Sequence, residues 1–397
     1  MYITKNTPKK ICYILSEATS AFYDLGVLHG EIEFFGEKNW DIIIICGDKT
    51  KINKSKIHKK CQIKYINMKR EPDFSRDLIV LIKIIIILIK EKPSVTCYVI
   101  PKSAFIGAIA SWVARVPTRI YLLMAAKFET SIGIKRKILI FLEKLVINTS
   151  TKVLCVSESL RRLYHENMIP NRPNAISVIG KGSASGVDFE YFNSSLISEK
   201  SQVLKKKELD ILNTDFVIGF IGRINKDKGV EDLIESVLKI KNNNKYDNIK
   251  LVLVGKFDSN NFIDEKYIKL ISETDWIKHF TFTEDIRLIY KCMNIFVLPT
   301  YREGFPSVVL EAYAMKIPVI TSNATGAIDS VVENITGLTF PVSNITKLTN
   351  SILDLIEDTD KRSLIAENGY RWAYENFNKN KIVEKIYNFY IGENIYE

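Results

Sequence analysis

The chain has 397 residues, of which 46% are hydrophobic and 26% are charged. This length suits two domains of roughly 150–200 residues, and this composition argues against a wholly disordered, a collagen-like or a multi-span membrane protein. The net charge is +10, with +13 on residues 1–200 and −3 on residues 201–397. The basic half suits a nucleic acid, an anionic membrane or a phosphorylated substrate.

Short apolar runs in the front half predict buried strands. They lie at residues 11–15, 41–46, 96–100, 119–123 and 152–156. Amphipathic stretches between them, such as residues 104–114 and 135–147, predict helices. Repeated β-α alternation with continuously apolar strands indicates a parallel sheet that helices cover on both faces.

Residues 78–89 form an almost entirely aliphatic stretch. It is shorter than the roughly 20 residues that a membrane-spanning helix needs, and Lys83 interrupts it. Arg76, Lys83 and Lys90 recur every seven residues, so a helix would carry them as one polar stripe. We expect a largely buried helix packed on a sheet, and the alternative is a helix that rests on a membrane surface.

The six cysteines form no C-x-x-C pair, and Cys12, Cys46 and Cys155 lie in apolar runs that predict core strands. Buried free thiols in a reducing compartment explain this pattern better than disulfides or a zinc site. The first residues lack the apolar stretch of a signal peptide, so we expect a cytoplasmic protein.

The back half begins with a polar stretch, residues 194–215, which we interpret as a connection between domains that continues into the second sheet. Further strands are predicted at residues 216–224, 250–255, 294–300 and 317–321. Two α/β domains in tandem create a cleft, and ligands of such sheets bind at the carboxyl ends of the strands.

The most informative motif is at residues 299–314, PTYREGFPSVVLEAYA, which follows a strand and opens a helix. Pro306 suits the first helical turn, and Gly304 permits close approach of a ligand. The amides near Ser307 and Val308 form a phosphate site with the helix dipole. Glu303 and Glu311 would repel a phosphate that they faced. They are therefore expected to accept hydrogen bonds from hydroxyl groups on either side of it, and a nucleotide sugar carries hydroxyl groups in these two places.

A second motif, GFIGRINKDKG at residues 219–229, ends a strand and leads into a helix. Arg223 offers a fork for two phosphate oxygens, and Lys228 offers a point charge. Together they would offset a diphosphate and the charge that develops as it leaves. Two solvated cations on a surface loop are the alternative for this motif taken alone.

With these two motifs the chain resembles the family-4 retaining glycosyltransferases of GT-B fold. The resemblance covers almost the whole chain and implies an α/β fold with two Rossmann-like domains whose parallel sheets face each other across a cleft. The first, residues 1–193, would bind the acceptor and be completed by residues 379–397, with a helix at 379–390. The second, residues 194–378, would bind the nucleotide sugar.

The resemblance also implies roles for individual residues. Arg223 and Lys228 would hold the diphosphate, Glu311 the ribose hydroxyls and Glu303 the transferred sugar, and the backbone of Thr283 would meet the nucleobase. The implied catalytic residues are Glu303, Arg223 and Lys228. The implied donor site consists of Gly222, Arg223, Lys228, Thr283, Glu303, Gly304, Phe305, Pro306, Ser307, Val308 and Glu311. The family needs no metal and no cofactor beyond its UDP-sugar substrate.

Softer motifs in the front half resemble a bacterial subgroup that extends sugars on undecaprenyl diphosphate for capsule, O-antigen or N-glycan precursors. They lie at residues 68–71, 101–104, 128–130 and 181–188. The acceptor or membrane contacts that follow are Lys102, Ser103, Lys127, Glu129, Lys135, Arg136 and Lys137. The last three precede an apolar run, which suits an anionic lipid surface.

Some features depart from the family pattern. The loop at residues 16–20 lacks the glycine pair of many relatives, and residues 122–127 lack the histidine that many place there, so we assign no catalytic histidine. Asp358-Thr-Asp360 matches a metal-binding D-x-D, but its distance from the strand ends favours a solvated turn. Gly219 and Gly222 lack the third glycine of a dinucleotide site.

We therefore expect a retaining transferase that moves a hexose or N-acetylhexosamine from a UDP sugar to a polyprenyl-diphosphate-linked saccharide in bacterial surface-polysaccharide or glycan assembly. It would work as a peripheral protein on the inner face of the cytoplasmic membrane. A UDP-sugar 2-epimerase-like enzyme on the same fold is the nearest alternative. A basic nucleic-acid-binding protein is a further one, although the aromatic and glycine pattern of such modules is absent.

Overall fold

The computed structural model describes residues 9–16, 28–47, 59–68, 73–99, 101–168, 175–242, 244–258 and 261–393. The chain divides into two compact units, unit 1 (Met1–Ser185 with Lys379–Glu397) and unit 2 (Gly186–Asn378). Unit 2 begins at Gly186, before the expected boundary at residue 193. The amide of Val187 donates to the carbonyl oxygen of Phe377 at 2.8 Å, which joins this segment to unit 2.

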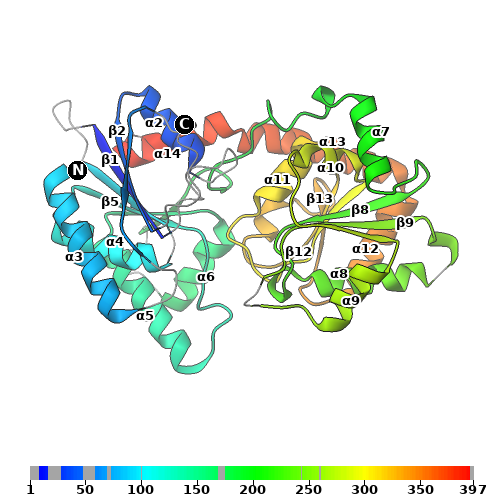
Figure 1. Ribbon diagram of the computed structural model, residues 1–397, viewed down its shortest axis with the longest axis horizontal. Coiled ribbons are helices and arrows are strands. Elements are labelled where there is room, and N and C mark those ends of the chain that lie inside the picture. The colour runs from blue at the N-terminus through cyan, green and yellow to red at the C-terminus, as the bar shows by residue number, and fades with distance from the viewer. Residues whose placement is uncertain are drawn as a thin grey trace. The chain divides into compact units, whose positions relative to one another are not determined.

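Within the described residues, unit 1 holds a seven-stranded parallel sheet of order β3-β2-β1-β4-β5-β6-β7 (Figure 1). The strands are β1 (Lys10–Leu15), β2 (Asp41–Cys46), β3 (Cys61–Tyr65), β4 (Val95–Tyr98), β5 (Thr118–Leu123), β6 (Lys152–Cys155) and β7 (Ile176–Val178). The central strands match the apolar runs. The edge strands β3 and β7 were not predicted, because β3 is largely half-exposed and alternates in polarity, and β7 is very short.

Helices cover both faces of this sheet. They are α2 (His29–Glu37), α3 (Phe74–Glu91), α4 (Pro101–Val113), α5 (Gly133–Thr149), α6 (Glu158–Met168) and α14 (Lys379–Ile391). α3 packs against α4, and α4 packs against α5, while α14 packs against α2. Right-handed crossovers place α3, α4 and α5 on one face of the sheet and α2 on the other.

The C-terminal helix α14 belongs to unit 1. The indole nitrogen of Trp40 donates to the hydroxyl of Tyr387 at 3.3 Å, and the hydroxyl of Tyr390 lies 3.3 Å from the sulfur of Cys97. The rings of Phe35 and Tyr387 meet edge to face at 5.0 Å. The chain thus leaves unit 2 after α13 and returns to a buried aromatic position in unit 1.

Unit 2 holds, within its described residues, a six-stranded parallel sheet of order β10-β9-β8-β11-β12-β13. The strands are β8 (Phe216–Ile221), β9 (Ile249–Val254), β10 (Ile277–Phe280), β11 (Ile295–Leu298), β12 (Val319–Ser322) and β13 (Gly337–Phe340). Its helices include α8 (Val230–Lys241), α9 (Glu265–Glu273), α10 (Ile286–Cys292), α11 (Ser307–Ala314), α12 (Ile345–Glu357) and α13 (Thr359–Phe377). The four predicted strands are present, and the edge strands β10 and β13 were again missed.

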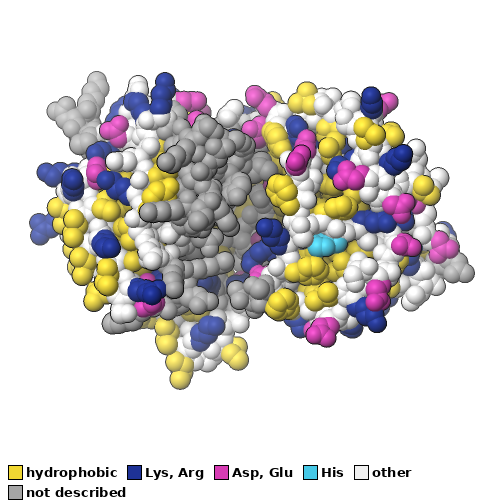
Figure 2. Space-filling view, in the orientation of Figure 1, with side chains coloured by type: hydrophobic (Ala, Val, Ile, Leu, Met, Phe, Trp, Pro, Cys, Tyr) yellow, Lys and Arg dark blue, Asp and Glu magenta, His cyan; other side chains and the backbone are white. Residues whose placement is uncertain are grey.

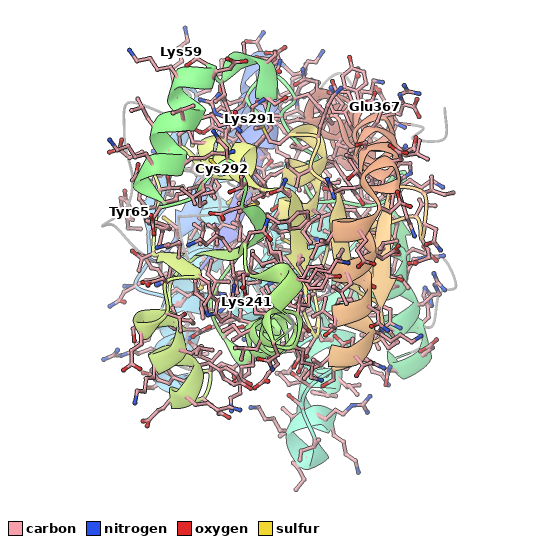
Figure 3. All side chains as sticks on the ribbon, turned by 90° about the vertical axis from the view of Figure 1, so that its right-hand side faces the viewer. Lys59, Tyr65, Lys241, Lys291, Cys292 and Glu367 are labelled. Atoms are coloured by element: carbon pink, nitrogen blue, oxygen red, sulfur yellow. The ribbon has the colours of Figure 1, made fainter. Side chains whose placement is uncertain are left out.

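The stretch interpreted as a connection, residues 194–215, contains a helix, α7 (Glu199–Glu208). Ser198 caps it by accepting from the amide of Ser201. α7 packs against α10, which ends at Lys291 and Cys292 (Figure 3). The side chain of Gln202 donates to the carbonyl oxygen of Lys291 at 2.7 Å. The prediction missed this helix because its apolar contacts are few and its exposed face is rich in lysine.

Helix α3 contradicts the expectation of a largely buried helix. Val80, Ile84 and Leu88 face the core, but Ile82 and Ile86 are 49% and 59% exposed. The apolar composition does show that α3 is a helix, but it does not show which of its faces is covered.

The cysteines fit the prediction of free thiols, since none forms a disulfide and Cys61 alone among the six is partly exposed. In the part of the chain that the structure describes, no helix combines the length and the hydropathy needed to span a bilayer.

Candidate active site

The loop between β11 and α11 carries the first motif. Pro306 is the N-cap of α11, one position earlier than expected, and Ser307 begins the helix. The amides of Ser307 and Val308 therefore belong to the first turn, where helix geometry supplies no intrahelical acceptor. The amide of Glu303 donates to the carbonyl oxygen of Thr325 at 2.9 Å. A Cβ on Gly326, whose φ is +77°, would lie 2.3 Å from the carbonyl oxygen of Gly304, so a glycine is required there.

The loop between β8 and α8 carries the second motif and contacts the first loop. The side chain of Asn225 accepts from the amide of Lys228 at 2.9 Å and so caps a short 3₁₀ turn. Gly229, with φ +67°, follows this turn, and a Cβ there would lie 1.9 Å from the carbonyl oxygen of Pro299. The two loops thus meet backbone to backbone, which fixes Lys228 beside the β11–α11 loop.

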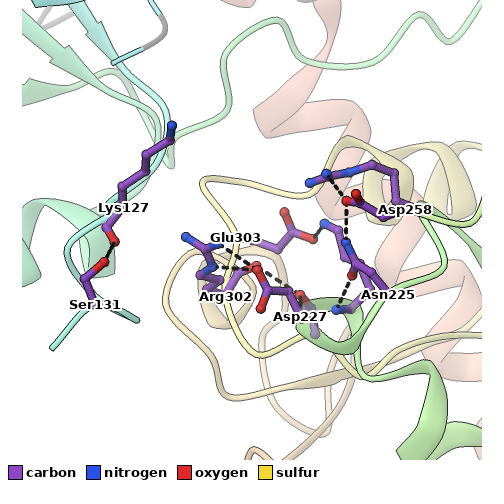
Figure 4. A network of polar contacts seen from close by, with 10 residues as sticks. Lys127, Ser131, Asn225, Asp227, Asp258, Arg302 and Glu303 are labelled. Carbon is purple, nitrogen blue, oxygen red and sulfur yellow. Dashed lines mark hydrogen bonds and ion pairs between the residues drawn. The ribbon is translucent and has the colours of Figure 1, made fainter. Parts of the chain in front are cut away.

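Two ion pairs join the loops (Figure 4). Lys228 Nζ pairs with Glu303 Oε1, and both side chains are mostly buried, at 18% and 14% exposure. The Nη2 and Nε atoms of Arg302 donate to Asp227 Oδ2 at 2.6 and 3.1 Å. The structure therefore brings together the lysine proposed for the diphosphate and the carboxylate proposed for the sugar.

Arg223 extends from the end of β8 toward Asp258, which follows β9. Its Nη1 atom donates to Asp258 Oδ2 at 2.6 Å, and the side chain of Asn225 donates to the same oxygen at 3.1 Å. Arg223 is 59% exposed, whereas Asp258 is 13% exposed. Asp258 is thus a well-packed acceptor that orients an accessible guanidinium.

Glu311 lies in the second turn of α11, with Tyr290 of α10 beside it. The hydroxyl of Tyr290 lies 3.0 Å from Glu311 Oε2 and 3.0 Å from the carbonyl oxygen of Val308. Burial raises the pKa of Glu311 to about 7, although the hydrogen bond from Tyr290 acts in the opposite direction. A carboxyl with this pKa changes its charge within the physiological range.

Thr283 and Phe305 have different surroundings. Thr283 lines a cavity of about 410 Å³ between α7, α10 and the loop after β10, together with Phe280, Phe282 and Leu288. The ring of Phe305 lies 5.2 Å from the ring of Phe377 at the end of α13, so its first contact is with the core of unit 2.

The predicted acceptor residues belong to unit 1. Lys102 Nζ pairs with Asp77 Oδ1 of α3 at 2.7 Å, and the side chain of Ser103 is fully buried, so it offers an acceptor no accessible atom in this conformation. Lys127 is exposed and Glu129 is half-buried, both in the loop after β5. Residues 17–20 and 69–71, named for the front-half motifs and for a departure from the family pattern, lie outside the described residues.

The three cations at the start of α5 do not act alike. Arg136 turns inward, where it donates to the side chain of Asn167 and lies 5.9 Å from the ring centroid of Phe128. Lys135 and Lys137 are exposed. The D-x-D match is structural, because Asp358 caps α13 by accepting from the amide of Lys361 at 2.8 Å.

Comparisons with known proteins now give the family. Residues 202–372 match the protein family "Glycosyl transferases group 1", and residues 10–157 match the family "Glycosyl transferase 4-like". The capsular polysaccharide biosynthesis glycosyltransferase CapM of Staphylococcus aureus is 34% identical over 390 residues, which are 97% of this chain and 98% of that protein. The chain belongs to this glycosyltransferase family.

Other relatives of this glycosyltransferase agree. UDP-Gal:alpha-D-GlcNAc-diphosphoundecaprenol alpha-1,3-galactosyltransferase of Escherichia coli is 25% identical over 365 residues, 91% of each chain. The crystal structure of Anabaena HepE in complex with UDP has a TM-score of 0.75 at 18% identity and covers 96% of this chain and 99% of that one. The GT-B fold and the family implied by the two motifs are thus confirmed.

Several polar residues of the candidate site were not predicted from the sequence. Asp227 and Asn225 lie inside the second motif, and Asp258 follows a strand end, so their positions were available as a signal. Their pairing with Arg302 and Arg223 was not. Outside this site, the sequence also did not single out Glu143 of α5 in unit 1, a buried carboxyl that accepts from the hydroxyl of Tyr121 at 2.9 Å. Burial raises the pKa of Glu143 to about 7.

Proposed function

We propose that this glycosyltransferase moves a hexose or N-acetylhexosamine from a UDP sugar to a polyprenyl-diphosphate-linked saccharide with retention of anomeric configuration. The observation that carries the proposal is the polar network in which Arg223 contacts Asp258, Asn225 joins Asp258 to Lys228, and Lys228 pairs with Glu303 in the loop before α11. The names of the relatives support the substrates: one is a capsular enzyme, one uses UDP-galactose and a diphosphoundecaprenol acceptor, and one structure holds UDP.

The diphosphate would bind by exchange of partners. Lys228 and Arg223 now each face a carboxylate, and a diphosphate offers the same oxygen chemistry with more charge. The amides of Ser307 and Val308 add donors at a helix N-terminus, where the dipole favours an anion. These groups supply the positive charge needed without a metal ion.

The transfer would proceed on one face of the sugar. The bond between the anomeric carbon and the diphosphate oxygen breaks, and the acceptor hydroxyl bonds to the same face of that carbon. The proton of the hydroxyl passes to the leaving diphosphate. Lys228, Arg223 and the α11 amides stabilise the charge that grows on the diphosphate, and they need no reorganisation to do so.

The two glutamates would bind opposite ends of the donor. Glu311 would accept hydrogen bonds from the ribose hydroxyls, and Glu303 would contact the hydroxyls of the transferred sugar. The negative charge of Glu303 would stabilise the positive charge that the sugar ring gains in the transition state. Thr283 would meet the nucleobase through its backbone. This order follows the positions of the two residues, one before α11 and one in its second turn.

The acceptor would bind unit 1. Lys102, Lys127 and Glu129 follow strand ends of its parallel sheet, where ligands of such sheets bind. Lys135 and Lys137 would contact anionic lipid at the inner face of the cytoplasmic membrane, which brings the enzyme to a lipid-linked substrate.

Incubation with radiolabelled UDP sugars, with and without a polyprenyl-diphosphate saccharide, tests the proposal. The expected result is transfer of label to the lipid fraction, with the same anomeric configuration in the product as in the donor. The activity should persist when a metal chelator is added. Conversion of the UDP sugar without acceptor would instead support an epimerase. Tight, salt-sensitive binding of a mixed oligonucleotide, with no consumption of any donor, would support nucleic-acid binding. A prior screen of UDP sugars by shift in melting temperature selects the donor.

A further inference from the structure

Helix α3 presents an aliphatic face away from the core of unit 1. Its members, which we call the outer face of α3, are Leu78, Ile79, Ile82, Ile86 and Ile89, each 49–59% exposed. At 3.6 residues per turn these positions fall within an arc of about 100°. The buried residues Val80, Ile84 and Leu88 lie on the opposite side. An ordinary surface helix is apolar toward the core and polar toward water, whereas α3 is apolar on both sides.

The acidic residues of α3 are paired, as is Arg76 with Asp73 at 3.3 Å, whereas its two lysines are exposed. Asp77 and Glu91 are held in ion pairs inside unit 1, to Lys102 at 2.7 Å and to Lys10 and Lys64 at 3.2 and 2.9 Å. Lys83 and Lys90 are exposed, and helical geometry places them along one edge of the outer face. The solvent side of α3 is therefore aliphatic with a basic margin.

Helix α5 repeats this arrangement in the same layer. Ile134, Ile138 and Phe141 are 77%, 54% and 64% exposed, and helical geometry places Lys135 and Lys137 on either side of them. α4 packs between α3 and α5. Hydrophobic side chains gather over α3 at the left edge of the molecule, and others lie at the lower end of α5, with lysine and arginine among them (Figure 2).

A cavity adjoins the outer face where α3 and α4 end. It measures about 410 Å³, and Leu88, Ile89, Ala114, Val116 and Pro117 supply its apolar wall. Lys92 and Arg115 also line it, each in a left-handed conformation at the end of its helix. An apolar hollow with two cations suits a hydrocarbon chain below an anionic headgroup.

We propose that the outer face of α3, together with the exposed residues of α5, docks on an anionic lipid bilayer. The aliphatic side chains lie among the acyl chains, and Lys83, Lys90, Lys135 and Lys137 lie at the level of the phosphates. This inference deepens the membrane contact of the proposed function by adding a second helix and by locating the surface that inserts.

Charge favours a bilayer over a second copy of the chain as the partner. A two-fold contact between two copies uses the same patch on both. Each copy would then bring its own basic margins toward those of the other, and like charges across an interface are costly. An anionic bilayer satisfies the lysines and the aliphatic side chains together.

Vesicle binding by the full-length protein tests the proposal. Vesicles of equal parts phosphatidylglycerol and phosphatidylcholine should sediment the wild type, and pure phosphatidylcholine vesicles should sediment it at least tenfold less well. The double variant Ile82→Asp/Ile86→Asp should lose at least tenfold in affinity for the anionic vesicles, because it places two charges in the inserted surface. Lys83→Gln/Lys90→Gln should lose about fivefold for each charge, from about 1 kcal/mol per cation.

A matched control lies on α7 of unit 2, where Val203 and Leu204 are 58% and 59% exposed. Val203→Asp/Leu204→Asp introduces the same charges and should bind vesicles as the wild type does. Melting temperatures report whether each variant is folded. If Ile82→Asp/Ile86→Asp is unfolded, Lys83→Gln/Lys90→Gln still tests the proposal.

Four outcomes separate the possibilities. Unchanged vesicle binding by both α3 variants would overturn the proposal. A lipid-free wild type that is dimeric by light scattering, becomes monomeric in Ile82→Asp/Ile86→Asp and ignores vesicles would show that a second copy covers this face. Vesicle binding without sugar transfer would defeat the proposed function alone, whereas transfer to a water-soluble acceptor without vesicle binding would defeat this inference alone.

Discussion

The candidate-site loops of unit 2 and the outer helix layer of unit 1 use charge in opposite ways. In the loops, each cation faces a carboxylate at hydrogen-bond distance, and glycines lock the backbones together. In the helix layer, exposed lysines border aliphatic side chains that water surrounds. Paired charges on a rigid frame suit a small anion that exchanges one partner for another. Cations around an apolar face suit a partner with a large surface.

The largest expected effect lies in the loops. Lys228→Ala and Arg223→Ala should each lower the transfer rate by about a hundredfold or more, because each removes a preorganised charge that faces the leaving group. Lys226→Ala is the matched control, since Lys226 lies in the same loop but pairs with Asp264 at 2.6 Å, away from the cluster. Steady-state kinetics with the full-length enzyme measures the effect. Near-normal turnover in the first two variants would remove both residues from the site.

Glu303→Gln should lower kcat by about tenfold to a thousandfold with donor KM nearly unchanged. The sugar ring gains positive character as its bond to diphosphate breaks, so the carboxylate is worth more in the transition state. A double variant with Lys228→Ala measures how far the ion pair couples the two residues. An effect confined to KM would place Glu303 at the nucleotide instead of the sugar.

Glu311→Gln should mainly raise the donor KM, because ribose barely changes between ground and transition state. With a pKa of about 7, the wild-type carboxyl gains a proton as the pH falls below neutrality, and a protonated carboxyl is a poorer acceptor for two hydroxyls. Donor KM of the wild type should therefore rise from pH 8 to pH 6, while that of the variant should stay level. Parallel profiles for the two proteins would exclude this role.

The same pKa makes a stability prediction without substrate. The folded state binds this proton more tightly than the unfolded chain does, so the carboxyl favours folding below pH of about 4.3 and loses that contribution as the pH rises toward 7. Relative to wild type, Glu311→Gln should gain melting temperature on going from pH 5 to pH 8. The difference between the two proteins is the measurement, because Glu31 and Glu143 are also buried carboxyls with raised pKa values.

The smallest effect is expected at α5. Lys135→Gln/Lys137→Gln should weaken binding to anionic vesicles by about 1 kcal/mol per charge, with little change in activity on a short, water-soluble acceptor. Arg136 is left intact because its contacts with Asn167 and Phe128 are internal. Lys200→Gln/Lys207→Gln on α7 removes the same charge elsewhere. Equal loss with both acceptors would make the α5 lysines structural.

The sequence predicted the centre of each sheet better than its edges. Central strands are buried on both faces and are continuously apolar, as at residues 42–46, whereas the edge strand β3 is half-exposed and resembles a loop in composition. The cluster of Arg223, Lys228 and Glu303 was predictable, because parallel strands bring their carboxyl ends to one edge. The pairing of Arg223 with Asp258 was not, since it depends on side-chain geometry. The exposure of α3 was mispredicted because hydropathy does not reveal which face a neighbour covers.

The return of α14 to unit 1 has a consequence during synthesis. Trp40 and Tyr387 touch, although 347 positions separate them along the chain. At ribosomal rates of about 5–20 residues per second, translation from Trp40 to Tyr387 takes roughly 20–70 s. During that interval the aromatic face of α2 is bare, and unit 2 can finish folding before unit 1 does. The order of completion is thus the reverse of the order of translation, and a nascent chain stalled before α14 should be a preferred client of chaperones that bind exposed aromatic surface.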